Sequence, residues 1–251
     1  MSVIPAGFGS AAGDYTIDGS LRFRSSADAS LARTFSTPTD GKTWTYSVWV
    51  KRAKAPTTLG HGGAHLLCTA GSGAQGFFGF GWNSADDVSF GFSGYNRRYS
   101  TGVLRDRSAW YHIVLKVDTT QATESDRAIL YVNGVVFPWT TNTAITQNST
   151  TQINQAVAHS IGDQTGQPYE SYDGYLTEIN FIDGQALDPT EFGEFDVDTG
   201  SGNQNVTQAH TALTDSIYPP QKRLRLMDLI QLFTKALVQF RPLITWGLLL
   251  I

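Results

Sequence analysis

The sequence lacks most of the features that mark secreted, membrane-spanning or nucleic-acid-binding proteins. Cys68 is its only cysteine, so the chain cannot form an internal disulfide, and we expect a buried apolar role for this side chain. The net charge of −4 at neutral pH gives no indication of a basic face for nucleic acid. Residues 1–13 show neither the basic nor the apolar part of a signal peptide. We therefore expect synthesis in a reducing cytoplasm and no nucleic-acid partner.

Long apolar runs are also missing from residues 1–198, so no transmembrane segment and no membrane partner are expected there. Amphipathic helical periodicity is absent before residue 186. The chain has instead 25 glycines, which is typical of many turns, and a series of short segments in which bulky and polar residues alternate. This pattern predicts an all-β fold, a two-sheet antiparallel sandwich.

Residues 44–51 give the clearest strand signal, and residues 110–117 alternate in the same way. The side chains predicted to point from the first of these strands into the core are Trp44, Tyr46, Val48 and Val50. Trp49 lies on the opposite strand face. We expect it to pack beneath a neighbouring loop, and a sugar-stacking platform is the alternative.

A hairpin is predicted where residues 128–132 and 135–137 flank Asn133 and Gly134, because this dipeptide supplies the two positive-φ positions of a type I′ turn. A long loop is predicted at residues 140–155. The remaining strands are predicted at residues 20–24, 31–35, 64–70, 76–82, 88–92, 97–103, 156–161 and 174–182.

The strand predicted at residues 174–182 leads into a short helix. Gly184 is a turn residue, and the residues after it follow the pattern of a capping box. Asp188 is the predicted N-cap and Pro189 the first helical residue, and the Glu191 side chain is expected to reach back to the start of the helix.

Three stretches of the sequence resemble one family. Residues 172–195 (YDGYLTEINFIDGQALDPTEFGEF), 42–52 (KTWTYSVWVKR) and 108–134 (SAWYHIVLKVDTTQATESDRAILYVNG) are similar to laminin-G-like, concanavalin A-like lectin/glucanase domains of tailed-phage structural proteins. The resemblance covers most of residues 14–198 and implies a jelly-roll sandwich over that range. Residues 1–13 are small and rich in Gly and Ala, which predicts a flexible lead or joining segment. The resemblance also implies a phage origin and a place in the virion.

Residues 199–251 differ in character from the rest of the chain, because strand alternation stops and residues 221–251 are apolar with scattered basic residues. Members of the resembled family typically continue with a sequence similar to WKPKRYTGTYGTNGFYL. When the reading frame of residues 202–218 is moved back by one base, each codon permits that sequence, in order and without a gap. We therefore expect a tail that is read out of frame and is poorly ordered or helical only by accident. A genuine amphipathic helix over residues 224–240 is the alternative.

Catalytic chemistry is not indicated by the sequence. Glucanases of this fold use acids that alternate on one strand, and the nearest patterns, residues 194–198 and 124–126, are predicted to be solvated linker and loop. The five histidines have no spacing that suits zinc. We therefore predict a protein that is not an enzyme, with a glycan depolymerase of the glucanase type as the alternative.

Binding chemistry is indicated by aromatic and polar residues in the predicted loops. Aromatic faces beside amide and guanidinium groups suit the recognition of sugars or proteins, although packing onto the sandwich would explain each residue singly. The candidates are Trp82, Asn83, Tyr95, Asn96, Arg97, Tyr99, Trp139, Tyr169 and Tyr172. The resemblance also implies calcium at a rim of the sandwich, bound by loop acids that would otherwise be solvated. These acids are Asp86, Asp87, Asp118 and Asp163.

The sequence as a whole predicts a non-catalytic structural or adhesion module of a phage virion, which binds carbohydrate or protein through loops on a rigid scaffold. The expected partners are a host-surface glycan, other virion proteins or further copies of the same chain. A purely architectural decoration of the capsid or tail is a third hypothesis.

Overall fold

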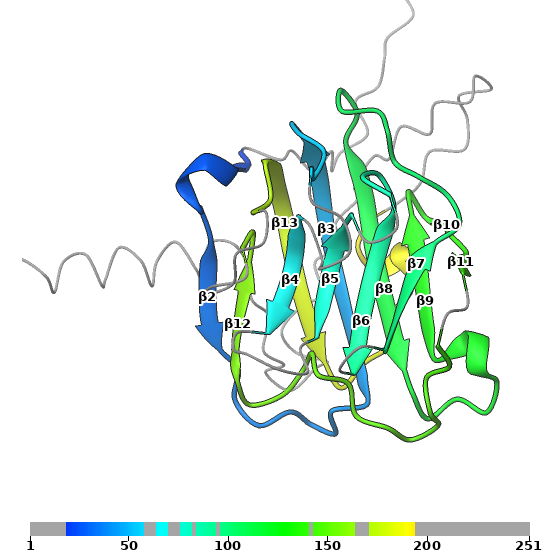
Figure 1. Cartoon of the computed structure of the whole chain (residues 1–251). Coiled ribbons are helices and arrows are strands. Elements are labelled where there is room, and N and C mark those ends of the chain that lie inside the picture. The colour runs from blue at the N-terminus through cyan, green and yellow to red at the C-terminus, as the bar shows by residue number, and fades with distance from the viewer. Residues whose placement is uncertain are drawn as a thin grey trace, which may run out of the picture.

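Two antiparallel β-sheets pack face to face in the computed structural model (Figure 1). The structure describes residues 19–57, 64–69, 76–81, 84–93, 96–140, 143–163 and 171–193. The predicted all-β sandwich is confirmed, because the strand pairs within both sheets are antiparallel. The predicted lead at residues 1–13 and the predicted tail at residues 199–251 lie outside the described residues.

The first sheet has six strands, with β3 between β13 and β8. Gly174 lies opposite Arg52 at one end of the β13–β3 pair, and Asp183 lies opposite Trp44 at the other. In spatial order the strands are β1 (Leu21–Phe23), β13 (Gly174–Asp183), β3 (Thr43–Arg52), β8 (Tyr111–Asp118), β9 (Ala128–Val132) and β10 (Val135–Val136).

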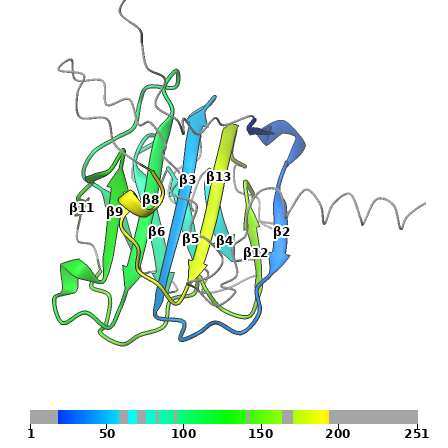
Figure 2. The same ribbon diagram turned by 180° about the vertical axis from the view of Figure 1, so that it is seen from behind.

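The second sheet has seven strands and lies across the first, as the front and back views show (Figures 1 and 2). The predicted strand at residues 97–103 is shorter than expected and ends at Ser100. In spatial order the strands are β11 (Trp139–Thr140), β7 (Asn96–Ser100), β6 (Val88–Ser93), β5 (Phe77–Phe80), β4 (His65–Thr69), β12 (Ala158–Ile161) and β2 (Leu31–Thr34).

The core lies between the two sheets and is built from alternate residues of each strand. The ring centroids of Tyr46 and Phe78 are 5.9 Å apart, as are those of Trp44 and Phe90, so aromatic edges and faces interlock across the interface. The Tyr46 hydroxyl donates to the Leu66 carbonyl at 3.0 Å, which satisfies its buried polar group. The predicted core face of β3 is confirmed, since its members are fully buried: Trp44, Tyr46, Val48 and Val50.

Part of the outer face of the six-stranded sheet is covered by the closing segment, residues 184–193, which crosses β8 and β9 (Figure 2). The Thr45 hydroxyl donates to the Gln185 carbonyl at 2.7 Å and accepts the Leu187 N–H at 2.8 Å. Phe192 packs in a second apolar cluster that includes Val114. The closing segment therefore buries sheet surface that would otherwise face water.

The expectation that Trp49 packs is confirmed, and its ring partner is His112 of the neighbouring strand β8. Its side chain is 8% exposed and its ring stacks on His112, with centroids 5.0 Å apart. His112 in turn packs against Phe192, and the centroids of these two rings are 6.3 Å apart. Trp49 therefore offers no open ring face for a sugar.

The helix after the closing strand is a single 3-10 turn, and the predicted capping box is wrong. The predicted N-cap Asp188 and first residue Pro189 are confirmed, but no side chain caps the turn. The Asp188 carboxylate instead accepts Lys116 Nζ at 2.8 Å and the Tyr131 hydroxyl at 3.2 Å, which ties the closing segment to the sheet. The helical turns are η1 (Ser25–Ala27), η2 (Glu124–Asp126) and η3 (Pro189–Glu191). Within the described residues, no helix is long and apolar enough to cross a membrane.

Two further predictions on single residues are confirmed. Asn133 and Gly134 have φ values of 49° and 77°, as a type I′ turn requires, and they join β9 to β10. Cys68 is fully buried, and burial is the main cause that raises the pKa of its thiol to about 12. The thiol is therefore protonated at neutral pH.

Candidate functional site: an arginine rim beside the seven-stranded sheet

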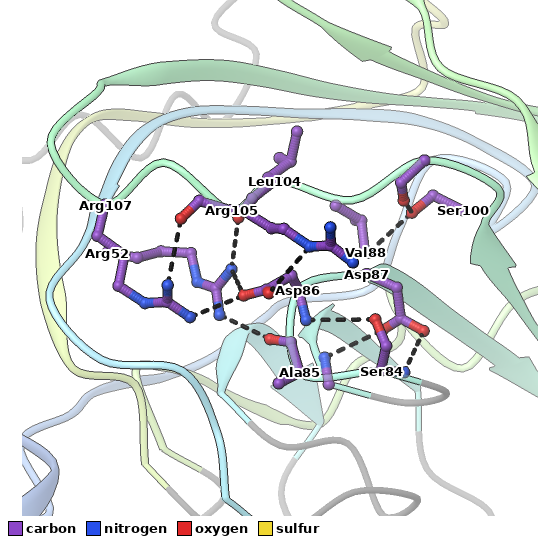
Figure 3. Close-up of polar contacts among 12 residues, drawn as sticks. Arg52, Ser84, Ala85, Asp86, Asp87, Val88, Ser100, Leu104, Arg105 and Arg107 are labelled. Atoms are coloured by element: carbon purple, nitrogen blue, oxygen red, sulfur yellow. Dashed lines mark hydrogen bonds and ion pairs between the residues drawn. The ribbon is translucent and has the colours of Figure 1, made fainter.

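One rim of the sandwich gathers three arginines around a single aspartate. Arg52 continues the inward-facing series of β3, so its side chain points between the sheets and is 0% exposed. Its guanidinium donates to the carbonyls of Ala85 at 2.7 Å and Leu104 at 2.8 Å, and to Asp86 Oδ1 at 3.1 Å (Figure 3). Arg52 therefore ties together the β5–β6 loop and the β7–β8 connection.

Burial makes this guanidinium unusually dependent on its partners. It lies over the Phe80 ring, with the guanidinium carbon 4.3 Å from the ring centroid. Burial is the largest cause that lowers the pKa of Arg52, and the charge of Asp86 is the largest cause that opposes it. The ion pair with Asp86 thus keeps a charge stable at a position largely removed from water.

Arg105 and Arg107 contact the same carboxylate from the solvent side (Figure 3). Arg107 donates to Asp86 Oδ1 at 2.8 Å, and Arg105 Nε lies 3.8 Å from Asp86 Oδ2. The side chain of Arg107 is 37% exposed and that of Arg105 is 77% exposed, whereas that of Asp86 is 17% exposed. We call Arg52, Asp86, Arg105 and Arg107 the arginine rim. Arg105 and Arg107 face water, Arg52 is buried, and the Asp86 carboxylate lies largely beneath the two outer cations.

Neighbouring acids are held by the backbone of the same loops. Asp87 is buried, and its carboxylate accepts the N–H groups of Gly81 at 3.2 Å and Ser84 at 2.9 Å. Asp106 is exposed and accepts the N–H and the hydroxyl of Ser108, and these hydrogen bonds are the main cause that lowers the pKa of Asp106. Asp106 is therefore the exposed negative charge beside Arg105 and Arg107.

The rim borders the outer face of the seven-stranded sheet. The Ser100 hydroxyl at the end of β7 accepts the Val88 N–H at the start of β6, at 3.0 Å, directly after Asp86 and Asp87. The strand register places two neighbouring rows of side chains on the outer face. One row is Tyr99, Ser89, Gly79 and His65, and the other is Arg97, Gly91, Phe77, Cys68, Ser160 and Ala32.

The two rows consist mainly of small residues such as Gly79, Ser89 and Gly91, with larger side chains at Phe77 and Tyr99. Gly91 is required there, because a Cβ at this position would lie 2.3 Å from the ring of Phe77. Tyr99 is half-buried and Asn96 is exposed, whereas Arg97 is only 9% exposed. None of the seven strands contains an aspartate or a glutamate. Most members of the two rows are themselves buried, Ser89, Cys68 and Ser160 almost completely, so among the described residues this face presents the Tyr99 ring on its β7 side and no carboxylate.

Residues 23–191 match the family described as the concanavalin A-like lectin/glucanases superfamily, and this range contains β2 to β13 and the arginine rim. The chain belongs to the concanavalin A-like lectin/glucanases superfamily. This finding confirms the domain family that the three sequence stretches resemble. No curated protein matches the chain.

Several solved structures, among them carbohydrate-binding modules, are distantly similar to this superfamily member. A candidate carbohydrate binding protein from Bacteroides ovatus is 16% identical, with a TM-score of 0.46, over 67% of this chain and 44% of that chain. Domains LG4-5 of the mouse laminin alpha1 chain are 13% identical, with a TM-score of 0.46, over 71% and 45%. The CBM40 of a Ruminococcus gnavus IT-sialidase, bound to alpha2,3 sialyllactose, is 15% identical, with a TM-score of 0.42, over 65% and 95%. The chain thus spans less than half of the first two structures.

The predicted ligand-binding residues do not form one cluster in this lectin/glucanase sandwich. Arg97 and Tyr99 point outward from β7, and Asn96 is the exposed first residue of the same strand. Trp139 lies on the neighbouring β11 and donates its indole N–H to the Ala128 carbonyl at 3.0 Å, as expected for loop packing. The remaining candidates, Trp82, Asn83, Tyr95 and Tyr169, lie outside the described residues.

Tyr172 is a correction to the predicted ligand-binding set. Its side chain is fully buried, and its hydroxyl donates to the Lys51 carbonyl at 3.0 Å. Its ring packs edge-on against Phe23, with centroids 6.1 Å apart. The sequence places Tyr172 just before a strand, where loop and core cannot be told apart, and the structure assigns it to the core.

The four predicted calcium ligands are not brought together. Asp86 faces three guanidinium groups and Asp87 accepts backbone N–H groups, so neither carboxylate is arranged for a cation. Asp118 lies at the far end of β8 from the rim and accepts the Thr120 hydroxyl at 2.6 Å. Asp163 lies near Asp28, with the Ser171 hydroxyl 2.9 Å and 3.1 Å from their respective carboxylates.

No group of three or more His, Cys, Asp or Glu side chains that could hold a metal occurs in the described part of the chain. A calcium site made of all four predicted acids therefore does not fit this structure. Calcium binding elsewhere stays a prediction.

The other chemical candidates have structural partners. Glu124 pairs with Arg98 and accepts the Ile145 N–H at 2.9 Å, which anchors the turn η2. His65, His112 and His159 are buried on three different strands. His61, His210 and the acids of residues 194–198 lie outside the described residues.

The arginine rim itself was not among the predicted sites. Two sequence signals point to it: Arg52 continues the alternation of Trp44 to Val50, and Arg105 and Arg107 are spaced by two just before the β8 strand. Neither signal identifies Asp86 as their common partner, because that pairing depends on the tertiary fold.

Proposed function

We propose that this protein is a non-catalytic glycan-binding module that uses the β7 side of its seven-stranded sheet and the arginine rim that follows this strand. Membership of a lectin/glucanase superfamily supports binding to carbohydrate. The observation that carries the non-catalytic part is the lack of any Asp or Glu in the seven strands. Hydrolysis by a glucanase mechanism needs two carboxyl groups about 5–9.5 Å apart across the glycosidic bond, and this sheet supplies none.

The chemistry of the described face suits a sugar. Tyr99 offers a partly exposed aromatic ring and Asn96 an exposed amide on the same strand, with the guanidinium of the largely buried Arg97 between them in sequence. Aromatic rings provide flat apolar surface for sugar rings, and amide or guanidinium groups provide directional hydrogen bonds to hydroxyls.

The test is a glycan array probed with the whole chain, together with release of reducing sugar from every glycan that binds. We expect binding without hydrolysis, and at least tenfold weaker binding by the Tyr99→Ala and Asn96→Ala double variant. Thr34→Ala, an exposed change on the far edge strand β2, is the matched control and should bind as the unaltered protein does. Hydrolysis would favour the depolymerase hypothesis, and no binding to any glycan would favour a purely architectural role.

We further propose that the module belongs to a phage virion, where it binds a host-surface glycan or neighbouring virion proteins. The support is the resemblance of residues 42–52, 108–134 and 172–195 to tailed-phage structural proteins. The out-of-frame hypothesis for residues 199–251 is part of this proposal. The nucleotide sequence tests both points: we expect a long open frame one base back after codon 201, and genes for virion components on either side. A closed frame would refute the out-of-frame tail, and flanking genes unrelated to virions would refute the virion proposal.

A further inference from the structure

The exposed charge of the arginine rim is unbalanced. Arg105 and Arg107 face water and Lys51, the residue before Arg52, is near enough to lower the pKa of Asp106. Asp106 is the exposed acid of this group, because Asp86 and Asp87 are largely covered. An approaching ligand therefore meets mainly positive charge at this edge of the sheet.

The hydrogen-bond donors of the two outer arginines are only partly used. Arg107 donates to Asp86 at 2.8 Å and to the Arg105 carbonyl at 3.2 Å. Arg105 approaches Asp86 through Nε alone, at 3.8 Å. Since a guanidinium carries five N–H donors in a planar fork, both residues keep donors for a second acceptor.

The rim is also held in position before any ligand arrives. Buried Arg52 fixes the Ala85 and Leu104 carbonyls, so both loops that carry the rim are attached to the same strand end. Asp86 shows that this set of guanidinium groups binds a carboxylate from the protein side. Charge-assisted bonds from a preorganised fork to a carboxylate or sulfate are among the strongest available to a protein surface.

We infer that the arginine rim selects an acidic glycan, with Arg105 and Arg107 binding a carboxylate or sulfate group of the sugar while the neighbouring β7 side of the sheet binds the rest. This inference rests on the proposed function and adds the chemical class of the ligand. The outward side of β7 agrees with it, because Arg97 lies there beside Tyr99 and the seven strands contain no acid that would repel an anion.

The experiment uses a glycan array on which sialylated, uronate-containing and sulfated glycans are each paired with a neutral counterpart. We expect the whole chain to bind acidic members at least tenfold more tightly than their neutral counterparts. The R105Q and R107Q double variant should lose that preference. R33Q, which changes an exposed arginine on the edge strand β2, is the matched control and should keep it. Thermal unfolding of each variant verifies that it is folded.

The outcomes separate this inference from the proposed function. Equal binding of acidic and neutral counterparts, or an unchanged preference in the double variant, overturns the acidic-glycan inference and leaves glycan binding intact. An equal loss in R33Q overturns it as well, because the attraction would then be unspecific charge. Absence of binding to every glycan overturns both proposals. Raising the ionic strength from about 0.05 to 0.5 M should weaken acidic binding by the unaltered protein much more than by the double variant.

Discussion

At the scale of the residue, Arg52 shows how a charged side chain can be part of a sandwich core. Its position in the inward series of β3 forces the guanidinium between the sheets, and three acceptors with the Phe80 ring compensate for lost water. The same contacts hold the two loops that present Arg105 and Arg107. One buried residue thus links the stability of the core to the geometry of the proposed site.

Replacing Arg52 should cost more stability than replacing either outer arginine. In Arg52→Met the two carbonyls and Asp86 lose their buried donor, and we expect the free energy of unfolding to fall by about 2–4 kcal/mol. The matched control is Arg105→Met. Because the Arg105 side chain is 77% exposed, this change should alter the free energy of unfolding by less than about 0.5 kcal/mol. Urea denaturation of both variants measures the difference. Equal effects would contradict the anchoring role.

At the scale of the element, the closing segment is a second layer attached to one sheet. Thr45 is fully buried, and its hydroxyl both donates to Gln185 and accepts from Leu187. Such a reciprocal contact fixes the segment next to the strand in a way that apolar packing alone does not. Phe192 then packs against His112, whose ring stacks on Trp49.

Thr45→Val removes this contact while keeping the shape of the side chain. Because the Gln185 carbonyl and the Leu187 N–H then lack a partner, we expect a loss of about 1–2 kcal/mol in the free energy of unfolding. Trp fluorescence should also shift as water reaches Trp49. The control is Thr34→Val, an exposed change on β2 that should alter stability by less than about 0.5 kcal/mol. If the two variants unfold alike, the hydroxyl contact does not hold the segment.

The strands could be predicted from the sequence because a strand with one buried face alternates apolar and polar residues with a period of two. The alternation of Trp44 to Val50 survives in the fold almost unchanged, and the Asn133-Gly134 turn follows from backbone sterics alone. The capping box was not predictable in the same way. Lys116 and Tyr131, which take over the Asp188 carboxylate, come from strands far away in sequence.

The candidate site was harder to predict than the fold, because it too depends on contacts between residues far apart in the sequence. Sequence alone cannot tell the buried Tyr172 from the half-buried Tyr99, since burial depends on what the tertiary fold places above each ring. The grouping of Arg52, Arg105 and Arg107 around Asp86 joins three separate segments of the chain. Such a cluster is a product of topology rather than of any local motif.

At the scale of the whole molecule, three buried histidines should make stability depend on pH. Burial is the main cause that lowers the pKa values of His65, His112 and His159 to about 4, from 6.5. Between these two pH values the unfolded chain binds more protons than the folded one, so stability falls as the pH is lowered from 6.5 towards 4. Each histidine contributes a slope of at most about 1.4 kcal/mol per pH unit.

Urea denaturation at a series of pH values from 7.5 to 4.5 measures this slope. We expect little change above about pH 7 and a steady loss below 6.5. His112→Gln should reduce the slope by about one third of its total, because one of three titrating groups is removed. A profile that stays flat down to pH 4.5, or a slope unchanged in this variant, would show that the histidines become protonated without unfolding the protein.

The sandwich should also be complete without the segment that follows it. Its core, its arginine rim and its closing segment all lie within residues 19–193, and the superfamily match ends at residue 191. A chain ending at residue 198 should therefore unfold within about 2 °C of the full chain, since 1 kcal/mol corresponds to roughly 2–4 °C for a domain of this size.

A chain ending at residue 183 is the control, because it loses Phe192 and exposes Val114 and Ile182. It should unfold at least about 5 °C lower or fail to fold. A large loss on removing residues 199–251 alone would contradict this account, because the two sheets would then depend on a segment outside the superfamily domain.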